Sequence, residues 1–153
     1  MTQITKKPET SRKATAACEV LFSNPRPWEL LRKGQGTHKG DVFSVARIAG
    51  IMAAKRTPDL VPLCHPGIGI TGVEISVDLV EPRGGDSDYG SMQIMSTVSC
   101  FGRTGVEMEA MTAATGAALT VYDMLKAVDK GMIIEGVRLL EKQGGKSGHW
   151  VRE

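Results

Sequence analysis

The sequence predicts an α+β fold in which helices pack against an antiparallel sheet. Residues 72–80 alternate apolar and polar side chains, which is typical of a half-buried strand. Residues 91–101 follow a glycine-rich loop and form the expected antiparallel partner of that strand, so the two segments predict a hairpin. Residues 106–128 are unusually rich in Ala, which predicts a long helix that packs closely against its neighbours.

The composition is that of an ordinary globular domain. The 153 residues are 41% hydrophobic and 24% charged, and such a chain can bury a core as one domain. The net charge of +2 gives no reason to expect a nucleic-acid partner, and no apolar run approaches the roughly 20 residues of a membrane span. The three cysteines cannot all pair, so a reducing, cytoplasmic setting is expected. We expect a single domain over residues 1–153, with residues 1–10 and 148–153 flexible.

The N-terminal part predicts a weak strand followed by a helix. Residues 1–19 are polar and basic and are expected to form a loose arm or a short edge strand, with a short strand candidate at residues 17–22. Two prolines then interrupt the pattern, and a glycine-rich loop ends at Asp41, a residue that favours helix N-caps. Apolar residues at helical spacing predict a helix over residues 41–55. Residues 57–69 carry three prolines and are expected to be irregular.

The C-terminal part completes the expected topology. Residues 132–142 predict a last strand, and residues 143–153 form a glycine-rich tail. The full order is strand, helix, strand, strand, helix, strand. This is the order of a split β-α-β, ferredoxin-like α/β sandwich with an antiparallel sheet.

The adjacent residues Cys64 and His65 allow three interpretations. A metal site is disfavoured because sequence neighbours rarely bind one ion together, and His38 and His149 do not stand at a recognisable ligand spacing. A thiol nucleophile needs an oriented base, whereas neighbours in an extended loop point apart. A substrate-binding loop and a pair of ordinary packing residues are evenly balanced on these residues alone.

Two glycine-rich segments are candidates for anion binding. Residues 144–148 surround Lys146 and resemble the end of a P-loop, but Leu140 stands where that motif needs a glycine. The segment is therefore either a general anion-binding loop or a disordered basic tail. Lys39 precedes the N-terminus of a predicted helix, where the helix dipole favours anions, although a solvated loop lysine is the simpler interpretation.

The long predicted helix carries charged residues among small apolar ones. Glu109 and Asp123 are 14 residues apart, close to four helical turns, so they share one face. Asp123 and Lys126 are neighbours at i,i+3 spacing. The pattern indicates an active site or a paired polar network, and an ordinary salt bridge is the alternative. Clustered cations would lower a lysine pKa, which suits acid–base chemistry on a phosphorylated substrate.

Four long motifs occur in order along the chain: KGDVFSVARIAGIMAAKRT, LVPLCHP, TGVEMEAMTAATGAALTVYDMLKAVDK and VRLLEKQGGKSG. Together they resemble the molybdenum cofactor biosynthesis protein C family, whose members are cyclic pyranopterin monophosphate synthases. The resemblance runs from about Lys7 to Gly148. It implies a ferredoxin-like lyase that converts 3′,8-cyclo-7,8-dihydroguanosine 5′-triphosphate to cyclic pyranopterin monophosphate and releases pyrophosphate. It further implies no redox cofactor and an obligate homohexamer, a trimer of dimers with active sites at subunit interfaces. Mg²⁺ beside the triphosphate is left open.

The resemblance also implies roles for individual residues. Lys39 and Lys126 match the family's catalytic lysines, and Asp123 matches its catalytic aspartate. As a hypothesis, the two lysines exchange protons with the ring system while Asp123 orients Lys126. The positions that match or adjoin the substrate-binding motifs are Leu63, Cys64, His65, Glu107, Met108, Glu109 and Lys146. His65, Lys146 and Arg12 would neutralise the triphosphate, and no residue is assigned to a metal.

A non-catalytic nucleotide-binding module of the same fold is the alternative function. It is disfavoured because both lysines and the aspartate that proton transfer needs are present. A metalloprotein that uses Cys64 and His65 is a third possibility. The chain departs from the family pattern at residues 2–4 and at Gly67, while the long loop at residues 81–90 lies outside every motif.

Overall fold

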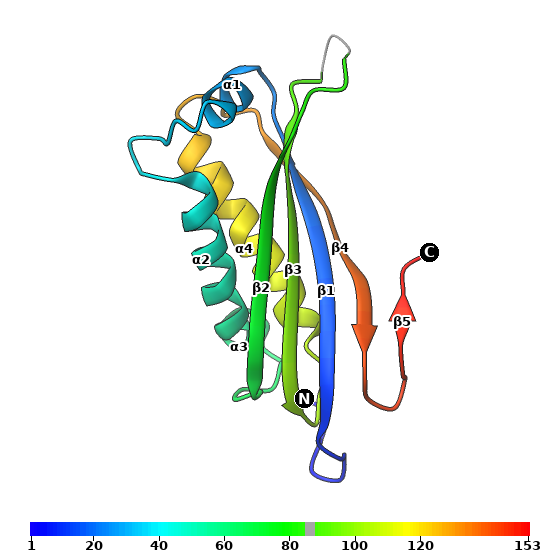
Figure 1. Cartoon of the computed structure of the whole chain (residues 1–153). Helices are drawn as coiled ribbons and strands as arrows, with labels where there is room; N and C mark the ends of the chain where they lie inside the picture. Colours follow the sequence, from blue (N-terminus) through cyan, green and yellow to red (C-terminus); the bar gives the residue numbers. More distant parts are fainter. Residues whose placement is uncertain (85–87) are drawn as a thin grey trace.

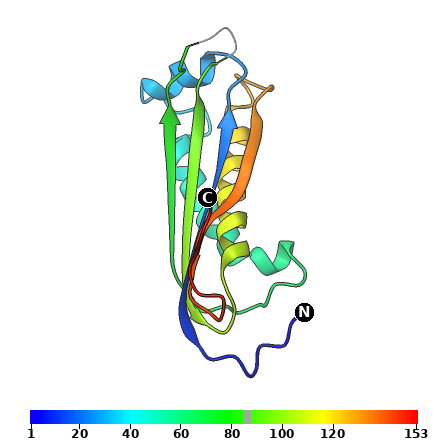
Figure 2. The same cartoon turned by 90° about the vertical axis from the view of Figure 1, so that its right-hand side faces the viewer.

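In the computed structural model, which describes residues 1–84 and 88–153, the chain forms one antiparallel sheet with two long helices on one side (Figures 1 and 2). The strands are β1 (Thr10–Leu21), β2 (Ile70–Val80), β3 (Ser91–Gly102), β4 (Ile133–Gln143) and β5 (Trp150–Val151). The helices are α1 (Arg26–Arg32), α2 (Val42–Lys55), α3 (Thr57–Leu60) and α4 (Glu107–Leu125). The strand order is β2-β3-β1-β4-β5, and each neighbouring pair is antiparallel.

Strand β1 differs most from the sequence prediction. It spans 12 residues at the centre of the sheet, with β3 on one side and β4 on the other, so the expected loose arm or short edge strand is wrong. Its buried face begins with small residues. Ala14 and Ala16 pack in one cluster with Ala110 and Ala113 of α4, and such small side chains give only a weak strand pattern.

The hairpin of β2 and β3 and the helices α2 and α4 are confirmed within a few residues of the expected bounds. The sequence does not predict helix α1, because two prolines in this segment indicate a break. Pro25 is its N-cap residue and Pro27 lies in its first turn, where a helix tolerates proline. Helix α3 similarly has Pro58 in its first turn, inside the segment that was expected to be irregular.

Helices α2 and α4 lie antiparallel against the same face of the sheet (Figure 1). They touch through small residues. A Cβ atom on Gly116 would lie 2.6 Å from the Ala53 Cβ, and one on Gly50 would lie 3.1 Å from the Ala113 carbonyl oxygen. The Ala-rich composition of α4 thus reflects a close approach between two helices.

The core fills the space between these helices and the covered face of the sheet. Its largest fully buried side chains include Val20, Met92, Ile94, Val121 and Leu125. The described helices leave the other face of the sheet uncovered, as Figure 2 shows. No helix in the described part of the chain has the length and apolar character needed to cross a membrane.

The contact between α2 and α4 gives a stability prediction. Gly116→Val would force a branched side chain against Ala53 and should lower the free energy of unfolding by about 1–3 kcal/mol in denaturant titration. Leu119→Val is the matched control, because it places the same β-branched residue at a 58% exposed position of α4. Equal losses in the two variants would contradict the close contact.

Candidate active site

Lys39, Asp123 and Lys126 meet at one end of the helix pair. The Lys39 Nζ donates to the Asp123 Oδ2 at 2.6 Å and to the Asp123 backbone oxygen at 3.0 Å. The Lys126 Nζ lies 2.6 Å from the other carboxylate oxygen, Oδ1. One carboxylate therefore bridges two ammonium groups, which we call the Lys-Asp-Lys triad.

The antiparallel helices bring the triad together. Lys39 lies just before the N-terminus of α2, and Asp123 lies in the last turn of α4. Backbone hydrogen bonds in both directions between Thr37 and Gly40, at 2.9 and 3.0 Å, close a tight turn that contains Lys39. Asp41 then caps α2 by accepting from the Phe43 N–H at 3.0 Å, as the sequence predicted.

Electrostatics keep the triad charged. Hydrogen bonds from Lys126 and Lys39 lower the pKa of Asp123 to about 2. The same carboxylate raises the pKa of Lys126. The expected lowering of a lysine pKa is therefore wrong for Lys126, because Asp123 binds the ammonium group directly. The triad therefore contains an ionised Asp123 beside a protonated Lys126.

A cavity of about 490 Å³ opens beside the triad. His38, Tyr122 and Lys130 line it together with the three triad residues. No sequence pattern predicts these three side chains at this site. One signal in the sequence could have indicated Lys130, since it follows Lys126 by four residues.

The substrate-binding candidates gather at the other end of α4. A cavity of about 240 Å³ is lined by Leu63, Cys64, His65, Glu107, Met108 and Glu109. Thr2 and Ile4 also line it, although this segment departs from the family pattern and was not predicted to lie at the site. His65 and Glu109 also line an adjoining cavity of about 380 Å³.

Glu109 is the most unusual side chain in this second group. It is only 2% exposed, and its Oε1 atom has no hydrogen-bond partner among the described residues. Burial raises the pKa of Glu109, and the charge of Glu107 raises it further. A buried carboxyl group without a partner is costly unless a ligand supplies one, so this side chain suits ligand binding.

Cys64 lacks the electrostatics of a nucleophile. Partial burial and the nearby Glu109 charge raise the pKa of its thiol. Burial likewise raises the pKa of the Cys18 thiol, to about 11, and that of Cys100. Raised values favour the unreactive thiol over the thiolate. Among the residues that the structure describes, no three His, Cys, Asp or Glu side chains are grouped to hold a metal ion.

Arg12 and the loop around Lys146 also lie at this end. The Arg12 Nε donates to the Gly102 oxygen at 2.9 Å. Gly144 and Gly145 have φ values of +87° and +74°, and a Cβ atom on Gly145 would collide with the Arg12 guanidinium. The loop that carries Lys146 thus turns directly against Arg12.

One chain therefore holds two separate groups of candidate residues. At 1.5 Å per residue, Glu109 and Asp123 are about 21 Å apart along α4. Their shared helical face does not bring them together, because one lies buried near the start of the helix and the other lies exposed near its end. We call them the Glu109 half-site and the Asp123 half-site.

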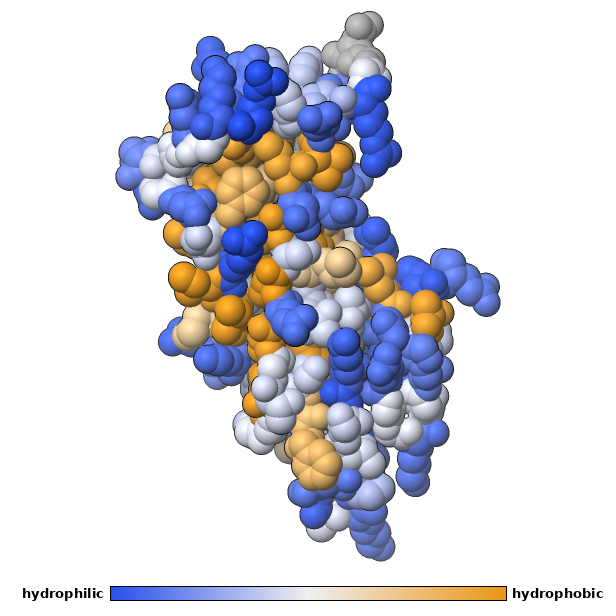
Figure 3. All heavy atoms as spheres, in the orientation of Figure 1, coloured by the Kyte–Doolittle hydropathy of each residue, from blue (hydrophilic) through white to orange (hydrophobic). Residues whose placement is uncertain are grey.

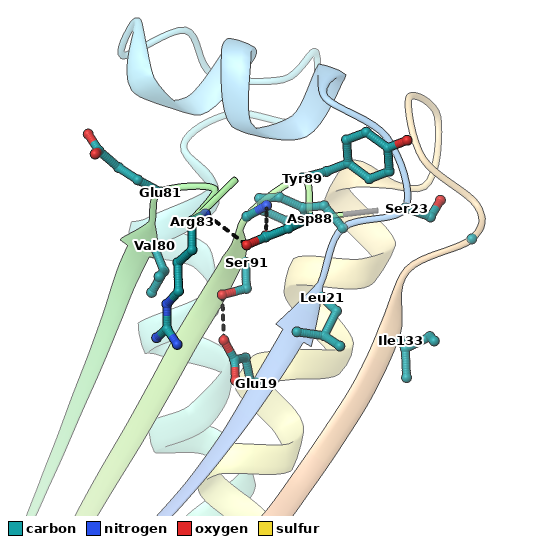
Figure 4. Close-up of a pocket in the computed structure, with 13 residues that line it drawn as sticks. Glu19, Leu21, Ser23, Val80, Glu81, Arg83, Asp88, Tyr89, Ser91 and Ile133 are labelled. Carbon is teal, nitrogen blue, oxygen red and sulfur yellow. Dashed lines mark hydrogen bonds between the residues drawn. The ribbon is translucent and has the colours of Figure 1, made fainter. Parts of the chain in front are cut away.

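A larger cavity, of about 570 Å³, lies beside the loop that joins β2 and β3 (Figure 4). In it the Ser91 hydroxyl donates to Glu19 at 2.5 Å. Among its described lining residues, the carboxylates of Glu19, Glu81 and Asp88 outnumber the single guanidinium of Arg83. This negative lining does not suit a phosphorylated ligand, and the cavity contains none of the candidate residues.

This chain is similar to known proteins of one family. The MoaC family model matches residues 1–145. The cyclic pyranopterin monophosphate synthase of Streptomyces avermitilis is 52% identical over 152 residues, which cover 99% of this chain and 83% of the relative. Proteins of the same name from Heliobacterium modesticaldum and Desulforamulus reducens are 50% and 52% identical over 153 residues, which cover 91% and 87% of those relatives and all of this chain. By the extent of these matches, the chain belongs to the MoaC family.

Proposed function

We propose that this chain is a cyclic pyranopterin monophosphate synthase, a lyase of molybdenum cofactor biosynthesis. Its substrate would be 3′,8-cyclo-7,8-dihydroguanosine 5′-triphosphate, and its products cyclic pyranopterin monophosphate and pyrophosphate. The observation that carries the proposal is the Lys-Asp-Lys triad beside a cavity. Relatives that are about half identical over the whole chain and bear this enzyme's name support it.

The triad suits the proton transfers that this reaction needs. Lys126 starts protonated, because Asp123 raises its pKa, and it can accept a proton once it has given one away. The raised pKa makes Lys126 a weak acid, so its proton would go to a strongly basic atom of the ring system. Closing the cyclic phosphate joins a substrate hydroxyl oxygen to the α-phosphorus and breaks the bond to pyrophosphate, which releases a proton. Asp123 would hold both amines in place through these steps.

The separation of the half-sites supports a complete site built from two copies of the chain. The Asp123 half-site of one copy would face the Glu109 half-site of another, with Arg12, His65 and Lys146 on the triphosphate. Exposed apolar side chains give copies a surface on which to associate. Val45, Ile48 and Met52 are 38%, 61% and 41% exposed on α2, the side of the molecule on which Figure 3 shows apolar side chains gathered. The proposed assembly is a homohexamer, a trimer of dimers.

Several finer properties belong to the same proposal. The fold would be ferredoxin-like, which the order β2-β3-β1-β4 with α2 and α4 on one side supports, and β5 would be an added edge strand. No redox cofactor is proposed, and any Mg²⁺ would arrive with the triphosphate. The three free cysteines support a cytoplasmic location.

Removal of one triad amine tests the activity. Lys126→Ala should reduce pyrophosphate release from the cyclised nucleotide by about 10²–10⁴-fold, because positioned acid–base groups contribute that much to the rate. Lys33→Ala, which removes an exposed lysine at the end of α1, should keep the wild-type rate with the same circular dichroism. A wild-type turnover rate in Lys126→Ala would contradict the proposed role of Lys126 in proton transfer. Wild-type protein that binds the nucleotide without turnover would favour the non-catalytic module.

The charge state of Asp123 can be measured directly. A carboxylate whose folded pKa lies below its ordinary 3.8 stabilises the fold above that pH and loses this contribution as the pH falls through about 2. A carbon-13 NMR titration should therefore find Asp123 ionised down to about pH 2. In Lys126→Ala its pKa should rise towards 3.8, since the first of its two lysine partners is lost. A wild-type pKa near 3.8 would contradict the bridged geometry.

Mixing variants tests the two-copy site. Lys126→Ala and Glu109→Gln damage opposite half-sites, so each should be inactive alone, whereas subunit exchange should restore activity in about a quarter of the sites. Lys126→Ala mixed with Asp123→Asn is the matched control, because both changes lie in one half-site and no intact pair can form. Equal activity in the two mixtures would show that complete sites do not combine two copies.

A further inference from the structure

The turn after α4 places a lysine that the reaction scheme above does not use at the Asp123 half-site. Lys130 lines the same cavity as the Lys-Asp-Lys triad. Lys39 and Lys126 share the single carboxylate of Asp123. None of the ion pairs in the described part of the chain involves Lys130. The cavity thus has three ammonium groups against one carboxylate, and Lys130 has no ion-pair partner among residues 1–84 and 88–153.

Asp129 fixes the backbone next to Lys130. Its side chain is only 2% exposed and accepts from the Ser23 N–H at 2.7 Å, from the Ser23 hydroxyl and from the Gly131 N–H at 3.0 Å. Ser23 follows the end of β1, so the central strand anchors the turn. A buried carboxylate with three donors is a rigid attachment point.

Two further bonds hold the turn from the helix side and from the loop before α1. The Tyr122 hydroxyl, on α4, donates to the Lys130 carbonyl oxygen at 2.9 Å. The Asn24 side-chain amide donates to the Val128 oxygen at 3.2 Å. The backbone of Lys130 is therefore held on both sides while its ammonium group is exposed at the cavity. A cation that is positioned in advance loses less entropy when it binds an anion.

We propose that Lys130 is a further substrate-binding residue, whose ammonium group contacts a phosphate oxygen of the substrate in the Asp123 half-site. The inference rests on the proposed function, because it takes the ligand to be a triphosphate. The triad lysines already have a carboxylate partner, whereas Lys130 lines the same cavity without one among the described residues and is free to pair with a phosphate. Asp129 and Tyr122 are then positioning residues that act through Lys130.

Steady-state kinetics test this role. Lys130→Ala should raise KM for the cyclised nucleotide about tenfold and change kcat by less than about twofold, as expected for the loss of one charge-assisted hydrogen bond. Lys130→Arg keeps the charge and should restore most of the affinity. Lys33→Ala removes an equal charge outside this cavity and should leave KM unchanged. A KM for Lys130→Ala no higher than that of Lys33→Ala would overturn the proposal.

A second measurement identifies the contacted group. Inorganic tripolyphosphate should inhibit the wild-type enzyme competitively, and Lys130→Ala should weaken that inhibition about tenfold. A higher KM with unchanged tripolyphosphate inhibition would overturn the phosphate contact. If Lys130→Ala has a lower thermal unfolding midpoint than the wild type, Lys130→Gln is measured in its place. Wild-type protein without turnover contradicts the proposed function, whereas active wild type with an unaffected Lys130→Ala contradicts only this inference.

Discussion

The close contact between α2 and α4 positions the candidate residues that lie on these two helices or in the loops next to them. Gly116 of α4 leaves no room for a Cβ atom against Ala53 of α2, so the two helices have one separation and one register. Because they run antiparallel, the loop before α2 meets the end of α4, which joins Lys39 to Asp123. At the other end, α2 leads through α3 to the loop of Cys64 beside the start of α4. A single helix–helix contact therefore organises both half-sites.

Strong local patterns predicted their elements, and weak ones did not. The hairpin and the helices α2 and α4 followed from alternation and helical spacing. Strand β1 was misjudged because its central position depends on Ala14 and Ala16, which bury well only against the equally small residues of α4. Helix α1 was missed because a proline in a first helical turn gives the same local signal as a proline that ends an element.

At the candidate site, local spacing predicted one contact and missed another. The pairing of Asp123 with Lys126 followed from i,i+3 spacing, whereas Lys39 and Asp123 are 84 residues apart and no local pattern could join them. The resemblance to a family gave the roles, but not the electrostatics, since a lysine pKa expected to fall is raised by the carboxylate it contacts. The spacing of Glu109 and Asp123 predicts a shared helical face, but a shared face does not report the distance between two residues along the axis.

The length of α4 between the half-sites has a consequence for how the protein responds to dilution. A folded single copy contains both sets of groups and yet cannot bring them to one substrate, since a helix of 19 residues does not bend back on itself. On the proposed two-copy site, specific activity then depends on protein concentration even where every molecule is folded. Loss of activity on dilution and loss of structure would be separate events, governed by the association of copies and by the stability of the chain.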